Sequence, residues 1–167
     1  MDIQQVLVAE YEQETAKTRR MLAAIPADAD FNYKPHEKSM SLGRLSGHVA
    51  ETAGEWAIHT LTQDVMEFPG MENYKPYLVT DAAQLLERFD REVAEAKTAL
   101  AAMTPEKWDS HWKFVSGGQT WIDNTKYRVF REWVLDHLIH HRAQLGVYLR
   151  LLDKPIPGTF GPSADGM

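Results

Sequence analysis

Residues 81–103 carry the most regular hydrophobic pattern in the chain. Apolar side chains recur there at steps of three and four, at Ala82, Leu85, Phe89, Val93, Ala96, Leu100 and Met103. Side chains at this spacing lie on one face of an α-helix, so the segment predicts an amphipathic helix that must bury its stripe against another element. Asp81, with Gln84 three residues later, resembles a capping box at the start of this helix.

Three further segments show the same helical spacing. They run from Ile3 to Ile25, from Ser39 or Ser41 to about Leu61, and from Asp123 or Asn124 to Leu152. Four helices of roughly 20 to 30 residues can bury their stripes against one another. This predicts an all-α protein, a four-helix bundle with long inter-helix connections. We expect one domain over residues 1–152, with the Pro- and Gly-rich segment 153–167 as a tail of the same domain.

Composition narrows the classes of function. The chain has 167 residues, a formal net charge of −6 and no cysteine. Nucleic-acid binding depends on clustered Lys and Arg, so nucleic acid is not expected as a partner. No apolar run reaches the roughly 18 residues of a membrane span, and the N-terminal segment does not resemble a signal peptide. We therefore expect a cytoplasmic protein with no membrane partner, whose metal ligands are restricted to His, Asp and Glu.

The segment DHLIHHRAQL, residues 136–145, places histidines where a helical stripe calls for leucine. His137 and His141 continue the stripe that passes through Val134 and Leu145. Histidines at positions i and i+4 can direct both imidazoles at one point, as metal-binding helices do. Burying two imidazoles without partners costs about 1–3 kcal/mol each, which a shared cation would offset. The alternative is that both rings bond to buried acids or to the backbone.

His48, in the second predicted helix, is the candidate third ligand. Three His ligands leave coordination positions open on Zn²⁺, Ni²⁺ or Fe²⁺, as in catalytic rather than structural sites. An open position can hold a water of lowered pKa, or it can take up a substrate thiol or oxygen anion. The alternative for His48 alone is a core histidine with a hydrogen-bond partner.

Two polar side chains near these histidines are candidate catalytic residues. Glu51 shares the helix face of His48 and could act as a general base or support a ligand. Gln144 lies one turn beyond His141 and could orient a substrate or a bound water. For Glu51, an ordinary solvated helix face is an equally good interpretation. His140 is expected to face a neighbouring helix or the rim of the site.

Two connections contain candidate lid segments. Residues 63–80 form a long connection, and residues 108–121 contain Trp108, Trp112 and Trp121. Aromatic and β-branched residues around Gly117 and Gly118 are typical of a small hairpin or an irregular lid. The alternative is that these segments only pack beneath long loops.

Several stretches together resemble the DinB-like (YfiT-like) metalloenzyme superfamily. They are SLGRLSGHVAE, HLIHHRAQLGVYLRLL and the ending PGTFGPSAD, with FNYKP before the second helix. The most specific element is His-x₃-His-Arg-x-Gln, matched by His137, His141, Arg142 and Gln144. Ala143 stands where many members have glycine, a change that does not touch the ligands.

The resemblance implies that His48, His137 and His141 bind one divalent metal ion per chain. Zn²⁺ and Ni²⁺ are the leading candidates, with Fe²⁺ and Mn²⁺ as others. It also implies a homodimer, and a reaction between a small-molecule electrophile and a low-molecular-weight thiol, as in thiol-dependent transferases of the family. One hypothesis is therefore a metal-dependent enzyme, an S-transferase or hydrolase, that activates a thiol or water. The other is a non-enzymatic, stress-related metal-binding protein with a structural or vestigial site.

Overall fold

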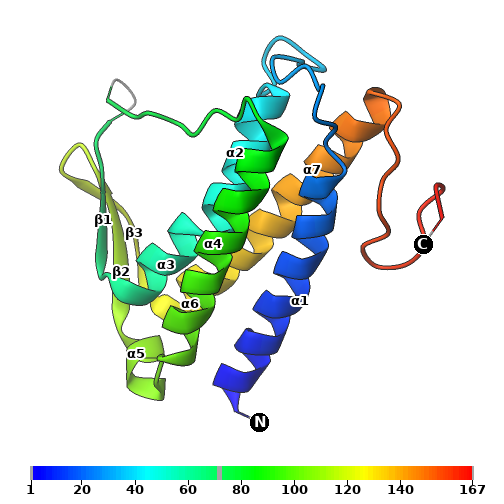
Figure 1. Ribbon diagram of the computed structural model, residues 1–167. Coiled ribbons are helices and arrows are strands. Elements are labelled where there is room, and N and C mark those ends of the chain that lie inside the picture. The colour runs from blue at the N-terminus through cyan, green and yellow to red at the C-terminus, as the bar shows by residue number, and fades with distance from the viewer. Residues whose placement is uncertain (1, 71–72, 167) are drawn as a thin grey trace.

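The computed structural model describes residues 2–70 and 73–166 of the chain. Its long helices are α1 (Ile3–Ala23), α2 (Leu42–Ala53), α4 (Ala82–Ala101) and α7 (His137–Leu151). These four helices pack side by side and enclose the core (Figure 1). The remaining elements are α3 (Glu55–Thr62), β1 (Val65–Phe68), α5 (Pro105–Asp109), β2 (His111–Ser116), β3 (Gln119–Thr125), α6 (Lys126–Val129) and the π-helical segment η1 (Phe130–Asp136).

The prediction of an all-α protein is wrong, because a three-stranded sheet stands beside the bundle (Figure 1). The strand order is β1-β2-β3, with β1 parallel to β2 and β2 antiparallel to β3. Gly117 and Gly118 form the hairpin turn with φ of 59° and 76°, a region that glycine adopts without strain. Strand β1 has only four residues and pairs with Lys113–Ser116, far along the chain, so local sequence gave no sign of it.

The second predicted helix is divided in two at Gly54. The backbone of Gly54 has φ −98° and ψ −88°, which are not helical, so α2 ends before this residue and α3 begins after it. A Cβ atom at this position would lie 2.5 Å from the Glu92 side chain, so α4 approaches too closely for any larger residue. Ser41 caps the start of α2 by accepting a hydrogen bond from the Arg44 N–H.

The fourth predicted helix begins later than expected and is not uniform. Strand β3 extends to Thr125, which caps α6, and residues 130–136 then form a π-helical segment. Such segments shift the helical register and occur often at functional sites. The shift comes directly before His137, the first residue of α7.

Glycines in α2 allow an extended segment to lie against the helix. A Cβ atom at Gly43 or Gly47 would collide with the backbone carbonyl of Val79 or Tyr77, respectively. The segment 77–79 therefore runs directly over α2. This close approach brings the Tyr77 backbone to the part of α2 that carries His48.

The C-terminal segment lies beside α7 and α1 (Figure 1). Arg150 on α7 forms an ion pair with Asp165 at 2.6 Å, and Asp165 also accepts from the Ile156 N–H. Residue 167 of the predicted tail lies outside the described residues, as do residues 71 and 72 of the predicted 63–80 segment. Among the helices of the described residues, none is both long enough and apolar enough to cross a membrane.

Candidate metal centre

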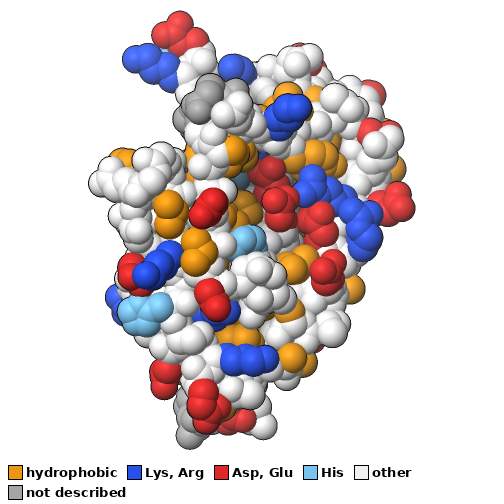
Figure 2. Space-filling view, turned by 90° about the vertical axis from the view of Figure 1, so that its left-hand side faces the viewer, with side chains coloured by type: hydrophobic (Ala, Val, Ile, Leu, Met, Phe, Trp, Pro, Cys, Tyr) orange, Lys and Arg blue, Asp and Glu red, His pale blue; other side chains and the backbone are white. Residues whose placement is uncertain are grey.

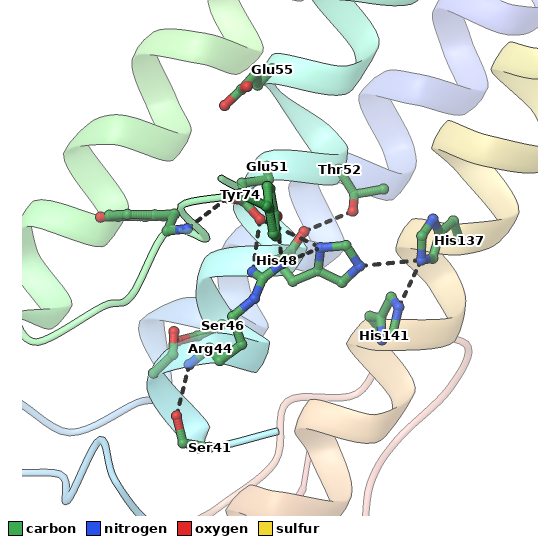
Figure 3. Close-up of polar contacts among 12 residues, drawn as sticks. Ser41, Arg44, Ser46, His48, Glu51, Thr52, Glu55, Tyr74, His137 and His141 are labelled. Carbon is green, nitrogen blue, oxygen red and sulfur yellow. Dashed lines mark hydrogen bonds and ion pairs between the residues drawn. The ribbon is translucent and has the colours of Figure 1, made fainter. Parts of the chain in front are cut away.

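Three histidines from two helices meet between α2 and α7. The Nε2 atom of His137 lies 3.3 Å from Nε2 of His48 and 2.7 Å from Nε2 of His141 (Figure 3). One nitrogen from each residue lies within 4.8 Å of the others. We call this group the three-His cluster. The structure thus brings together all three residues that the sequence predicted as ligands.

The spacing of these nitrogens fits one shared metal ion. Imidazole nitrogens bind Zn²⁺ at about 2.0–2.1 Å, which separates two ligands on one ion by about 2.9–3.4 Å. The His48–His137 distance of 3.3 Å falls in this range, and the His137–His141 distance of 2.7 Å falls just below it. Two of the three pairs therefore suit one shared ion, and the third pair, His48 and His141, lies within the 4.8 Å that spans the group.

Two of the three rings are held neutral, the form in which histidine is a ligand. Burial, together with the adjacent His141 and His48, lowers the pKa of His137 to about 4. Burial also lowers the pKa of His141 to about 4, although its hydrogen bond to Gln144 acts in the opposite direction. Both imidazoles therefore keep a free lone pair at neutral pH, the form in which histidine binds a cation.

Glu51 lies behind His48, on the side of the ring that faces away from the cluster. Its Oε2 atom is 3.5 Å from Nδ1 of His48 and 2.8 Å from Nη1 of Arg44, and its Oε1 accepts from the Tyr77 N–H at 2.9 Å (Figure 3). Burial alone would raise the pKa of Glu51, but its hydrogen bonds to His48, the Tyr77 backbone and Arg44 outweigh burial and lower it. Glu51 is therefore a carboxylate in contact with His48.

Two neighbours of opposite charge lie beside Nδ1 of His48. Arg44 Nη2 is 3.3 Å away and can only donate, whereas the Glu51 carboxylate is 3.5 Å away and can only accept. When Nδ1 carries its proton, Glu51 is the neighbour that accepts it, and the Nε2 lone pair is then left for the cluster. A carboxylate behind a metal-binding histidine is a common supporting arrangement. Catalysis by Glu51 stays a prediction, and the geometry supports an orienting role instead.

Gln144 orients the His141 ring through its Nδ1 atom. Its Oε1 atom lies 2.7 Å from Nδ1 of His141, and its Nε2 lies 3.1 Å from Nε2 of His140. Donation of the amide N–H to His140 fixes the amide so that its oxygen accepts the His141 Nδ1–H. The third ring, His137, has its own partner in the Trp133 backbone. Each of the three rings thus has a polar partner in addition to the cluster.

The three-His cluster opens on a cavity of about 630 Å³ between the bundle and the sheet. His48 is part of its wall, which also includes six aromatic residues: Trp56, Phe68, Tyr74, Trp112, Phe114 and Trp133. We call it the aromatic cavity. Figure 2 shows the side of the molecule on which the sheet stands, where hydrophobic side chains gather near the middle with acidic and basic ones around them.

The two predicted lid segments supply part of this cavity wall, but their tryptophans have different places. Trp112 lines the cavity and donates to Nδ1 of His59 at 3.3 Å. Trp108 is buried in the core and donates to Gln4 at 2.8 Å. Trp121 is 66% exposed and does not line the cavity.

Sequence reasoning missed Arg44 and Tyr74 at the site. Arg44 lies one turn before His48, and this i, i+4 spacing could have identified it. Its Nη2 donates to the Tyr74 hydroxyl at 3.0 Å. Tyr74 comes from an irregular connection, and no local pattern marks it. Burial raises the pKa of Tyr74 and the nearby Glu51 raises it further, so the phenol stays protonated.

The fold and this site define a class of helical-bundle protein with an added sheet and a three-histidine group that could hold a metal ion. The family model of the DinB family matches residues 1–165, and the chain belongs to that family. Two solved structures share its fold. A DinB-like protein from Bacillus cereus is 18% identical with a TM-score of 0.70, over 92% of this chain and 95% of that one. A DinB-like protein from Bacillus subtilis, YjoA, is 21% identical with a TM-score of 0.67, over 92% and 96%. No curated protein matches the sequence.

Proposed function

We propose that this chain is an enzyme that depends on one divalent metal ion, held by His48, His137 and His141, and that uses a thiol or water as its nucleophile. The observation that supports this proposal most strongly is that three imidazole Nε2 atoms lie together beside a cavity large enough for a substrate. Three neutral imidazoles suit Zn²⁺ or Ni²⁺, with Fe²⁺ and Mn²⁺ as further candidates. A bound ion of this kind lowers the pKa of a water or thiol, which supplies a nucleophile near neutral pH.

A second hollow, bordered by His141 and not by His48, favours a thiol over water as the nucleophile. This hollow, of about 370 Å³, is bordered by His141 and Gln144 and by the polar side chains of Lys38 and Ser39. The lining of this hollow includes one cation, Lys38, and several hydrogen-bonding groups but no acidic side chain, whereas the lining of the aromatic cavity includes Glu55 and Glu67. A hydrophilic, low-molecular-weight thiol with a carboxylate fits such a hollow, whereas a hydrolase needs no second binding site.

In the proposed transfer, the thiol sulfur forms a bond to an electrophilic carbon and the bond from that carbon to its leaving group breaks. The electron pair departs with the leaving group, which takes up a proton, and the thiol proton is released to solvent. Tyr74 can supply the proton to the leaving group. Its hydroxyl oxygen accepts from Arg44, and no acceptor for its O–H is found among the described residues. Tyr74→Phe should therefore lower turnover while it leaves metal content unchanged.

A homodimer in the cytoplasm is also part of the proposal, supported by the family resemblance alone. Light scattering during size-exclusion chromatography tests it. A mass of two chains is the expected result, and a mass of about 19.1 kDa, that of one chain, contradicts it.

Turnover by purified, metal-loaded protein tests the enzyme itself. We expect saturable consumption of a low-molecular-weight thiol with an electrophile such as styrene oxide, whose ring oxygen takes up a proton when the carbon–oxygen bond breaks. This turnover should be lost in His137→Ala with the fold intact. The His111→Ala variant is the control, because the His111 side chain is 60% exposed and lies outside both the cluster and the cavity lining. Metal binding without turnover for any thiol, ester or amide would instead support a non-enzymatic metal-binding protein.

A further inference from the structure

The rings of the aromatic cavity contact one another from the sheet to the three-His cluster. Phe68 and Phe114 have centroids 5.8 Å apart, and Phe114 lies 5.8 Å from Trp133. Trp133 stacks on Trp56 at 5.8 Å with an interplanar angle of 25°, and Trp56 lies 5.3 Å from His137. Edge and face contacts between such rings stabilise one arrangement over others. The wall is therefore a set of ring surfaces already fixed before a ligand binds.

These rings come from four different elements, so the wall depends on the tertiary fold. Phe68 is on β1, Phe114 on β2, Trp56 on α3 and Trp133 on η1. A chain that needed only to cover its core could do so with aliphatic side chains. Here the aromatic groups instead border a cavity of about 630 Å³, within the usual range of roughly 300–1,000 Å³ for small-molecule sites.

Two of the charges that border the cavity are paired with other side chains. Arg44 is paired with Glu51 at 2.8 Å, and Glu55 with Arg88 at 3.0 Å. The other two charged residues of the lining, Glu67 and Lys75, are of opposite sign and exposed to solvent, which screens their charges. A charged ligand would therefore lose hydration in the cavity and gain only a screened or already paired counter-ion, which is costly. The interior suits an uncharged ligand.

The position of His48 in the cavity wall determines which end of such a ligand lies near the three-His cluster. His48 is the one member of the cluster in the cavity lining, which also includes Arg44 and Tyr74. Phe68, Phe114 and Trp112 belong to the sheet side of the cavity. A ligand that rests its ring on the sheet-side aromatic groups places its other end beside His48.

We propose that the aromatic cavity binds an uncharged small molecule with an aromatic ring, and that this molecule is the electrophilic substrate. Its role as a substrate rests on the proposed function, but its binding does not, because the cavity wall is formed by protein groups. Binding can therefore be measured on protein without metal.

Phenylnaphthylamine, an uncharged aromatic dye that fluoresces more strongly in apolar surroundings, is the probe. We expect saturable binding of one dye per chain to metal-free protein, with quenching of tryptophan emission. Trp133→Ala should weaken binding by about tenfold, since a buried ring contact contributes roughly 0.5–1.5 kcal/mol beyond the area it buries. Phe114→Leu, which keeps an apolar side chain, should weaken it by about threefold. Trp121→Ala, at an exposed tryptophan outside the cavity, should bind as the unmodified protein does.

Decanol, an uncharged chain without a ring, tests the chemical class. We expect it to displace the dye at least tenfold less well than naphthalene does. Equal displacement, or equal dye binding by the Trp133, Phe114 and Trp121 variants, would overturn the proposal. The outcome is separate from that of the proposed function. Protein that binds the dye but no metal would contradict only the metal-dependent enzyme, and protein that binds metal but no dye would contradict only the aromatic substrate.

Discussion

Glu51→Gln separates an orienting role of Glu51 from a catalytic one. The substitution keeps the size of the side chain but removes the charge that contacts Nδ1 of His48 at 3.5 Å and Arg44 at 2.8 Å. Loss of a partner behind a metal-binding histidine typically weakens metal affinity by about 10- to 100-fold, or roughly 1.4–2.7 kcal/mol. We expect this loss in isothermal titration of metal-free protein with Zn²⁺.

The same substitution also leaves Arg44 without its counter-ion. The two side chains are only 16% and 6% exposed, and breaking a buried pair costs roughly 3–5 kcal/mol. Because Arg44 is not fully buried and keeps its bond to Tyr74, we expect a loss of about 2 kcal/mol in the free energy of unfolding measured with urea.

Glu55→Gln is the matched control for Glu51→Gln. Glu55 follows one turn later, its side chain is 59% exposed, and it pairs with Arg88. Surface pairs of this kind contribute roughly 0–1 kcal/mol, so both Zn²⁺ affinity and stability should stay close to those of the unmodified chain. Unchanged Zn²⁺ affinity in Glu51→Gln, with turnover lost, would refute the orienting role and support a general base.

Three further predictions concern the scaffold. Phe89→Ala removes a core ring that is 1% exposed and should lower the free energy of unfolding in urea by about 3–5 kcal/mol. Burial alone would raise the pKa of Glu14, but hydrogen bonds from two buried cations lower it overall. This stabilisation is present above the ordinary glutamate pKa and is lost as pH falls through the lower folded value, so Glu14→Gln should flatten the acid side of a melting-temperature profile. Gly47→Ala places a methyl group against the Tyr77 carbonyl and should cost about 1–3 kcal/mol, with circular dichroism as the measurement. An unchanged melting temperature in Gly47→Ala would contradict the close approach of segment 77–79 to α2.

The bundle could be predicted from sequence because its signal is local. The stripe of α4 and the cap at Asp81 follow from helical spacing and side-chain chemistry, and the structure confirms both. The turn residues Gly117 and Gly118 indicated a hairpin as one of two interpretations, and β2 and β3 form it. Strand β1 could not be predicted, because it is stabilised by pairing with Lys113–Ser116 and not by its own four residues. The break at Gly54 depends on the nearby Glu92 side chain, which is close in space and distant in sequence.

The site was predictable to the same degree. His137 and His141 are one turn apart, so spacing alone placed them together. His48 was the candidate third ligand from the second predicted helix, and the family resemblance supported it. Glu51 and Gln144 lie one turn from their histidines, so both were candidates from spacing, Glu51 as a general base or as support for a ligand and Gln144 as a group that orients substrate or water. The aromatic cavity was not visible, because its wall forms only where the sheet meets α3 and η1.

Metal stoichiometry tests the central claim most directly. Metal-free protein is loaded with Zn²⁺ or Ni²⁺, freed of excess ion and measured by elemental analysis, beside the Ala variants of His48, His137, His141 and the exposed His111. The account predicts one tightly held ion per chain, its loss in each of the three cluster variants and its retention in His111→Ala. Full metal content in all three cluster variants would contradict the assignment of the three-His cluster as the metal site.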